Sequence, residues 1–307
     1  MIVKKHICSY KKHKIEKVKE FGSDNPACTF YVIRRKDKNV GLFSLYIVFL
    51  GEINYAIEHG YIPIIDMENY RNIYMEEDEF GKVNSWEKFF MQPCENISLT
   101  EVYHSKHVIL NDGEFFAYRP NDNLKCLNNK KIMKKWRQVA LKYMHINENV
   151  KRIIEEKYES LFPMHERYVG VLARGTDYLK LKPHGHPKQP DPNDLLEECR
   201  RVMKKYDCTK VFLATEDIAI KQLFENDLED KLCTLNSIYV DYEDGYIGNI
   251  SSKQKNEKMI KGEEYLASIV LLSRACCFIG GRTSGTVAAM IFNDNYEYKH
   301  IWDLGLY

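Results

Sequence analysis

The chain has 307 residues, of which 44% are hydrophobic and 29% are charged. These proportions are typical of a soluble globular protein, and the length allows two domains of ordinary size. Because 45 basic residues nearly cancel 44 acidic ones, the formal net charge of +1 argues against a dominant nucleic-acid-binding surface.

Cysteine spacing and the N-terminal residues indicate the compartment. The nine cysteines show no paired Cys-x-x-Cys spacing, which favours reduced thiols and argues against a structural zinc site. No apolar stretch follows Met1, and the longest apolar run, at 41–50, is too short to span a bilayer. We therefore expect a cytoplasmic protein, either free or in peripheral contact with the inner membrane.

The first half of the chain alternates strand-like and helix-like segments. An apolar helix is expected from Gly41 to about His59, because Gly60 stops it and a strand at 61–66 follows. The other expected elements are strands at 31–33 and 108–110, a short capped helix at 84–90, and helices at about 130–145 and 147–160. This alternation predicts an α/β sheet.

A second α/β unit is expected after the segment 161–165, which interrupts the pattern. The near-continuous apolar run at 168–173 is typical of a strand that is covered on both faces. Asp191 and Pro192 form a favourable helix start. The other expected elements are a helix at 195–206, a strand at 210–215, a helix that opens at 216–217, a strand at 237–241, a helix at 265–274 and a strand at 276–279. Two facing parallel sheets would place their strand ends around a shared cleft.

The last of these strands leads into a glycine-rich turn and a helix of small residues. Glycines leave room for a ligand to approach the backbone, and the unpaired N–H groups of a helix N-terminus attract phosphate. A cation and two hydroxyl groups in the turn strengthen this interpretation. The candidate phosphate-binding residues here are Gly281, Arg282, Thr283, Ser284 and Gly285.

Two further strand ends carry polar residues. Arg174 follows the strand at 168–173 and precedes Gly175, so its guanidinium could fork onto two phosphate oxygens. Thr176 follows Gly175. This strand end and the glycine-rich turn together predict one crevice that binds a diphosphate. The third strand end carries Thr215, Glu216 and Asp217, which could cap a helix, contact the ligand, or do both.

A reaction at such a site needs a group that accepts a proton. Asp177 follows the expected phosphate-binding residues, and the proline-flanked loop after it contains His184 and His186. A histidine can take a proton near neutral pH, although a lone histidine is more often structural. The sequence does not choose among these three candidate bases.

Three of these segments resemble the motifs of the α1,6-, α1,2- and protein-O-fucosyltransferases. The segment 172–177, Leu-Ala-Arg-Gly-Thr-Asp, resembles their H-x-R-R-T/G-D motif, and 212–217 resembles their A-T-D-D strand end. The segment 272–284 resembles their third motif, which is a helix, a strand and a serine-containing phosphate loop. Order and approximate spacing match over 168–292, and the strongest overlap is with the α1,6-type enzymes, including bacterial ones that decorate lipo-oligosaccharides.

The resemblance implies a GT-B-like fold, which is two facing Rossmann-like domains with a cleft between them. It implies an N-terminal domain at 1–163 on the acceptor side and a C-terminal nucleotide-sugar-binding domain at 164–307. It further implies an inverting glycosyltransferase that transfers fucose from GDP-fucose to a glycan, a polysaccharide or a lipid-linked acceptor. Neither a metal ion nor another cofactor is implied.

The sequence departs from the family pattern at three positions. Leu172, Gly175 and Ser268 stand where the family carries a histidine, a second arginine and an acid that pairs with guanine. Arg174 and Ser284 keep the phosphate-binding identities. Two alternatives therefore stay open, namely a transferase for a different nucleotide sugar and a non-catalytic protein that binds a nucleotide or a glycan. A Rossmann-fold reductase is weaker, because no Gly-x-Gly-x-x-Gly follows the first strand of either half.

Overall fold

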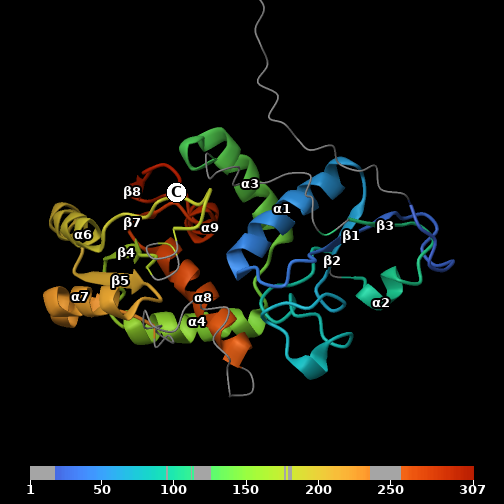
Figure 1. The fold of residues 1–307 in the computed structure, drawn as a ribbon, viewed down its shortest axis with the longest axis horizontal. Helices are drawn as coiled ribbons and strands as arrows, with labels where there is room; N and C mark the ends of the chain where they lie inside the picture. The colour runs from blue at the N-terminus through green and yellow to red at the C-terminus, as the bar shows by residue number, and fades with distance from the viewer. Residues whose placement is uncertain are drawn as a thin grey trace, which may run out of the picture.

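The structure is a computed structural model, and it describes residues 18–94, 96–111, 113, 126–175, 178, 182–235 and 257–307. It contains two separate parallel sheets (Figure 1). The smaller sheet has the strand order β2-β1-β3, with β1 at Phe30–Arg34, β2 at Ile62–Asp66 and β3 at Val108–Leu110.

The larger sheet lies in the second half of the chain and has the strand order β6-β5-β4-β7-β8. Each neighbouring pair is parallel. Its strands are β4 at Tyr168–Leu172, β5 at Lys210–Ala214, β6 at Leu232–Cys233, β7 at Cys277–Gly281 and β8 at Tyr298–Trp302. Because parallel strands need crossover connections, helices separate these strands along the chain and cover both faces of the sheet.

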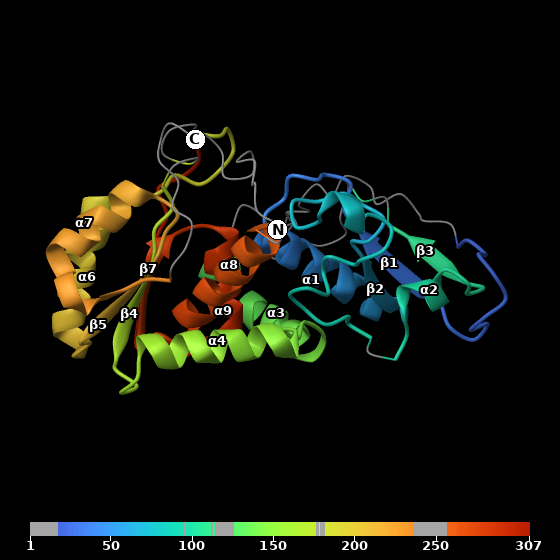
Figure 2. The same cartoon turned by 90° about the horizontal axis from the view of Figure 1, so that it is seen from below.

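Helices cover the outer face of the larger sheet and fill the space between the two sheets. Figure 2 shows α6 and α7 on the outer face of the larger sheet, and α8, α9 and α1 between the two sheets. The helices are α1 at Leu42–Glu58, α2 at Leu99–Val102, α3 at Lys130–Tyr143, α4 at Glu148–Leu161, α6 at Pro192–Tyr206, α7 at Ile218–Leu228, α8 at Glu257–Arg274 and α9 at Ser284–Phe292. Short 3-10 turns occur at Glu77–Glu79 and Glu229–Lys231.

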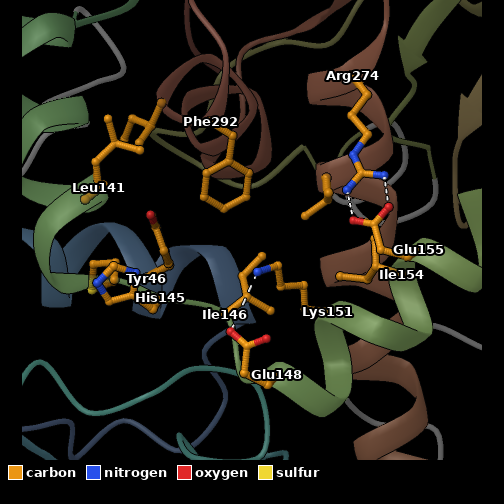
Figure 3. A pocket seen from close by; sticks show the side chains of 14 residues that line it. Tyr46, Leu141, His145, Ile146, Glu148, Lys151, Ile154, Glu155, Arg274 and Phe292 are labelled. Atoms are coloured by element: carbon orange, nitrogen blue, oxygen red, sulfur yellow. Dashed lines mark hydrogen bonds and ion pairs between the residues drawn. The ribbon is translucent and has the colours of Figure 1, made fainter. Parts of the chain in front are cut away.

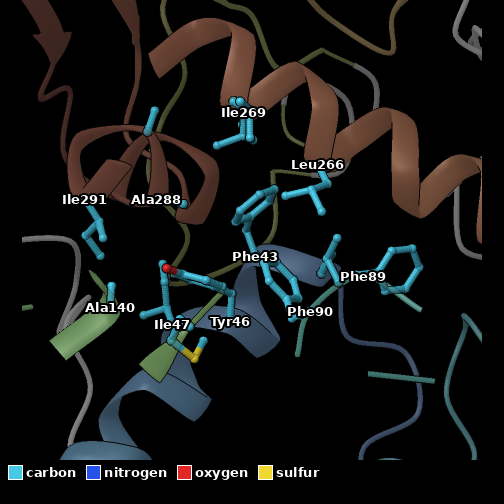
Figure 4. Close-up of a cluster of buried hydrophobic side chains, with 14 of the residues drawn as sticks. Phe43, Tyr46, Ile47, Phe89, Phe90, Ala140, Leu266, Ile269, Ala288 and Ile291 are labelled. Atoms are coloured by element: carbon cyan, nitrogen blue, oxygen red, sulfur yellow. The ribbon is translucent and has the colours of Figure 1, made fainter. Parts of the chain in front are cut away.

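The largest hydrophobic core lies between the sheets and is shared by both halves of the chain (Figure 4). Helix α1 is buried along most of its length, and Phe43 on it contacts Tyr265 of α8 with ring centroids 5.0 Å apart. A second core, built from the outer face of the larger sheet with α6 and α7, includes Val169, Cys199 and Phe224. Burial on both faces explains why β4 reads as a continuous apolar run.

Most expected elements are confirmed within a few residues. The segment 84–90 was expected to be a short helix, and this is wrong, because it forms a series of hydrogen-bonded turns. The reason is Asn84, whose side chain accepts from the Met67 N–H at 3.2 Å and donates to the Ile65 carbonyl at 2.7 Å. These bonds tie the segment to the end of β2. The expected strand at 237–241 lies outside the described residues, and β6, β8 and α2 were not anticipated.

Candidate functional site

The three polar strand ends of the second half meet at one edge of the larger sheet. Strand β4 lies between β5 and β7, and Leu172 is in register with both Ala214 and Gly280. The segments that follow these three strands therefore emerge side by side. This neighbourhood could not be read from the sequence, because the segments lie about forty and a hundred residues apart along the chain.

Arg174 projects from the end of β4 and is braced on two sides. Its Nε lies 3.4 Å from Oε1 of Glu216, and its guanidinium carbon lies 5.4 Å from the centre of the Tyr178 ring. The Gly175 N–H donates to the same Glu216 oxygen at 3.4 Å. The Arg174 side chain remains 19% exposed, so a planar cation with five N–H donors is presented at this edge.

Gly175 is required by its neighbour Asp217. A Cβ atom at Gly175 would overlap the Asp217 side chain, which is completely buried. Asp217 caps α7, because its carboxylate accepts from the N–H groups of Ala219 at 2.9 Å and Ile220 at 3.2 Å. The Thr215 hydroxyl in turn accepts from the Asp217 N–H at 3.1 Å. A larger side chain at this position, such as the arginine of the family pattern, would not fit beside Asp217 in this structure.

The glycine-rich turn after β7 is built around a helix cap. Thr283 is the N-cap of α9, and its hydroxyl accepts from the Thr286 N–H at 3.0 Å. The Thr286 hydroxyl donates to the Gly281 carbonyl at 2.6 Å, which closes the turn. Ser284 opens the first turn of α9 and is half-buried. The N–H groups of this first turn point out of the helix end, where an anion is stabilised.

Arg282 connects the glycine-rich turn to two other segments of the chain. Its side chain is 10% exposed and forms an ion pair with Asp303. Its carbonyl accepts from the side-chain amide of Gln189 at 3.1 Å. Burial raises the pKa of the nearby Cys126 thiol to about 11. Gly285 packs beneath α8, where a Cβ atom would lie 2.9 Å from Ile269.

The first turn of α1 faces the first turn of α9. The hydroxyl oxygens of Ser44 and Ser284 lie 3.3 Å apart, and they join the two halves of the chain at this point. Gly41 is the N-cap of α1, and this helix has no acidic residue in its first turn. Two positive helix ends therefore converge here. Sequence reasoning missed Ser44, although the order strand, glycine, helix at 30–58 repeats the order found at 277–292.

The candidate bases lie on the loop that leaves β4. His184 and His186 are exposed, and the loop pairs with the last residues of the chain through an antiparallel bridge between Pro187 and Leu306. Nδ1 of His186 lies 3.5 Å from the Tyr178 hydroxyl, so Tyr178 connects this histidine to Arg174. Sequence reasoning missed Tyr178. Asp177 and Thr176 lie outside the described residues.

The two altered base-reading positions are packed into the fold. Leu172 is 3% exposed and lies beneath Gly285. Ser268 is 8% exposed, and its hydroxyl donates to the Glu264 carbonyl one turn earlier in α8 at 2.8 Å. Neither side chain offers the charged or ring group that the family resemblance would require for reading a base.

The smaller sheet also ends in polar residues, which bind one another. The Tyr103 hydroxyl donates to Asp66 at 2.7 Å, and Arg34 donates to the Tyr70 hydroxyl at 2.7 Å. On α1, the fully buried Glu52 accepts from Tyr31 at 2.6 Å.

Among the described residues, no group of three or more histidine, cysteine or acidic side chains is close enough together to hold a metal ion. Within the same ranges, none of the helices combines the length and the apolar character needed to cross a bilayer.

Comparison with known proteins shows similarity at the level of the fold. A scan against protein-family models finds no match, and a search of curated proteins finds none either. Among solved structures, NodZ α-1,6-fucosyltransferase co-crystallized with GDP has a TM-score of 0.50 and 14% identity, over 86% of this chain and 93% of that chain. Selenomethionine NodZ from Bradyrhizobium has a TM-score of 0.50 and 15% identity, over 86% and 92%. The chain therefore has the GT-B-like fold, with two facing parallel sheets, that the resemblance implied.

Proposed function

We propose that the chain is an inverting glycosyltransferase that transfers fucose from GDP-fucose to a hydroxyl group of a glycan, a polysaccharide or a lipo-oligosaccharide. The observation that carries this proposal is the convergence of Arg174 with the first turn of α9 at the carboxyl edge of the larger sheet. The fold similarity to a NodZ structure that contains GDP supports the choice of nucleotide.

The site has the chemistry that a departing nucleoside diphosphate needs. In the proposed reaction the bond between the sugar C1 and the β-phosphate oxygen breaks, and a bond from C1 to the acceptor oxygen forms on the opposite face. The negative charge that develops on the phosphate would be stabilised by Arg174 and by the N–H and hydroxyl groups around Ser284. Fixed donors of this kind are commonly worth about a hundredfold each in rate. We propose that no metal ion or other cofactor takes part, so transfer should persist in EDTA.

The proton of the acceptor hydroxyl must pass to a base. His186 is our first candidate, because it is exposed and linked through Tyr178 to Arg174. His184 and Asp177 stay candidates. Alanine substitutions at each position, with turnover measured at saturating donor, identify the base, and turnover within a few-fold of wild type in all three would exclude this loop as its source.

The division of roles between the halves follows from the same proposal. Residues 164–307 would hold the donor, and 1–163 would face the acceptor. The chain would work in the cytoplasm, either free or at the inner membrane where a lipid-linked acceptor is presented.

A non-catalytic nucleotide- or glycan-binding protein is the second candidate. Leu172 and Ser268 favour it, because both are packed into the fold and neither can read a base. The same two positions leave room for a transferase that uses another nucleotide sugar.

A thermal-shift panel of GDP-, UDP-, CMP- and dTDP-sugars tests the donor. We expect stabilisation by GDP-fucose, and stabilisation by UDP or CMP compounds alone would overturn the fucosyltransferase proposal. Hydrolysis of GDP-fucose without acceptor then separates an enzyme from a binding protein, because many transferases slowly transfer to water. Binding without any release of fucose would support the non-catalytic alternative.

A further inference from the structure

The side chain of Gln189 joins two segments to which the proposed function assigns different roles. Gln189 lies between the loop of His186 and the start of α6, and it is 6% exposed. Its amide nitrogen Nε2 donates to the Pro187 carbonyl and to the Arg282 carbonyl, in each case at 3.1 Å. One buried amide group therefore links the loop with the candidate base to the glycine-rich turn with the candidate phosphate-binding groups.

The surroundings of the Gln189 amide fix its orientation. Its two N–H bonds match two carbonyl acceptors, and a reversed amide would place its oxygen against both carbonyl oxygens. In the observed orientation the amide oxygen Oε1 lies against Gly281, where an added Cβ atom would be 2.1 Å away. This oxygen has no hydrogen-bond partner among the described residues. The absence of a side chain at Gly281 thus leaves the space that the Gln189 amide fills.

One of the two carbonyls belongs to the peptide unit that leads into α9. Thr283, the N-cap of α9, follows Arg282 directly, and Ser284 opens the first turn of the helix. The position of this peptide unit therefore sets where the N–H groups of the first turn and the Ser284 hydroxyl lie. The ion pair between Arg282 and Asp303 is a second restraint on the same residue.

The other carbonyl belongs to the loop of the candidate bases, which is itself held by the segment 305–307. The Gly185 N–H donates to the Tyr307 carbonyl at 3.1 Å, and the Tyr307 N–H donates to the His186 carbonyl at 3.0 Å. Because these backbone bonds fix the loop, the hydrogen bond to Pro187 places the Gln189 amide relative to the loop. The same amide then places the turn before α9.

We propose that Gln189 is a positioning residue of the donor site, which holds the first turn of α9 and the loop of His186 in one fixed arrangement. The inference rests on the proposed function, which assigns the phosphate to α9 and the base to this loop. Gln189 itself would not touch the ligand, because both its N–H bonds are used by protein carbonyls. Its effect would reach a bound diphosphate through the turn at 281–284, since binding groups act together only when they are held to within about 0.5 Å.

The variant Gln189→Met tests the inference, because methionine has nearly the same length as glutamine and cannot donate to either carbonyl. Inorganic pyrophosphate is the first probe, since it tests the phosphate site without assuming a base or a sugar. Calorimetry on the full chain should show about five- to tenfold weaker binding of pyrophosphate and of GDP, the effect of one or two lost hydrogen bonds, with guanosine binding unchanged.

Wild-type affinity for pyrophosphate in Gln189→Met would overturn the inference, and so would a wild-type protein that does not bind pyrophosphate. A wild-type protein that binds pyrophosphate but not GDP would contradict the proposed donor, while pyrophosphate affinities would still decide the role of Gln189.

Gln92→Met is the matched control, because Gln92 is a glutamine with a similar role in the other half of the chain. Its Nε2 donates to the Ile65 carbonyl at 2.9 Å and to Glu87 at 2.8 Å. The variant should lower stability, as Gln189→Met does, but pyrophosphate affinity should stay within twofold of wild type. Equal losses of affinity in the two variants would show a general effect of lost stability, and would overturn the positioning role.

Hydrogen exchange measured by mass spectrometry gives a second readout, which needs no ligand. In Gln189→Met, exchange should become faster in peptides that cover 183–188 and 281–287. Exchange in α4, which the ion pair of Glu155 with Arg274 ties to α8 (Figure 3), should stay unchanged. Faster exchange confined to 183–188 would show that Gln189 does not hold the turn before α9, and would overturn the proposal.

Discussion

At the carboxyl end of the smaller sheet, Asp66 and Asn111 are completely buried and hydrogen-bonded to residues of their own half. At the carboxyl end of the larger sheet, Arg174 is 19% exposed, and Ser284 is half-buried. Both ends carry charged residues, but Asp66 and Asn111 are enclosed at the first end, whereas Arg174 and Ser284 stay partly accessible at the second. Polar residues at a strand end therefore do not by themselves mark a site, and their burial and partners decide whether they stabilise the fold or face a ligand.

Gly175 and Gly41, which follow strands of the two sheets, also differ in how closely other atoms approach them. Gly175 touches a buried cap residue, whereas Gly41 at the start of α1 would meet nothing within 4 Å of an added Cβ. The larger sheet thus combines an accessible edge with a rigid support beneath it, which is the arrangement that holds binding groups in place.

The largest expected effect is that of Gly175→Ala. The new methyl group would overlap Asp217 and displace the cap of α7, so the free energy of unfolding should fall by about 3 kcal/mol. Chemical denaturation measures this change. Gly41→Ala is the comparison variant, whose added Cβ meets nothing within 4 Å, so it should cost no more than about 1 kcal/mol, which is the usual cost of alanine at a helix N-cap. Equal losses for the two variants would remove the steric explanation of the glycine.

Arg174→Ala should weaken GDP binding about thirtyfold, or ~2 kcal/mol, because the lost contact is a charge-assisted one to phosphate. Guanosine binding should hardly change. Isothermal titration calorimetry with GDP and guanosine measures both affinities. Arg200→Ala, which removes an exposed arginine paired with Asp227, is the control and should leave both unchanged. If GDP and guanosine lose affinity equally, Arg174 does not contact the phosphate.

Glu52→Gln tests the buried hydrogen bonds in the half of the chain that contains the smaller sheet. Glu52 accepts from Tyr31 at 2.6 Å and from Asn111 at 3.3 Å, so replacement of one oxygen by an amide group should lower stability by about 1.5 kcal/mol. GDP affinity should stay within twofold of wild type. The comparison variant Glu216→Gln should do the reverse, with little change in stability and a measurable change in GDP affinity. If Glu52→Gln lowers GDP affinity more than Glu216→Gln does, the half of the chain that contains the smaller sheet contributes to the donor site.

Ser284→Ala should have the smallest effect, about a three- to fivefold loss of GDP affinity, because a neutral hydroxyl donor binds phosphate less strongly than the guanidinium of Arg174 does. The backbone N–H groups of the first turn of α9 remain in this variant. Ser273→Ala, whose hydroxyl donates to the Val270 carbonyl at the far end of α8, is the control. A loss larger than that for Arg174→Ala would reverse the assigned order of the two residues.

Local sequence patterns were sufficient for most of the second half. The apolar run of β4, the cap Asp217 and the glycine-rich turn before α9 each carry a signal within a few residues. Such signals are local because helix caps and buried strands depend mainly on neighbouring residues. The short strand β6 and the edge strand β8 lacked a comparable signal, since β6 has two residues and β8 is only partly buried.

Contacts between residues that lie far apart in the sequence could not be predicted from the sequence. Ser44 and Ser284 lie 240 residues apart, and Arg282 meets Asp303 only because β7 and β8 pair. The turns at 84–90 were also misjudged, because the Asn84 side chain bonds to the end of β2. In each case a tertiary contact determines which of several locally possible conformations or partners the residue adopts.

The sequence by itself determined the α/β class, the order of strands and helices, and the strand ends at which Arg174 and Ser284 stand, because periodicity, caps and glycine turns act over a few residues. Tertiary structure alone decided which strand ends are adjacent, that Ser44 of α1 meets Ser284 of α9, and that Arg282 binds Asp303. Strand order and the packing of helices from both halves bring these groups together, and neither is encoded in any short stretch of the chain.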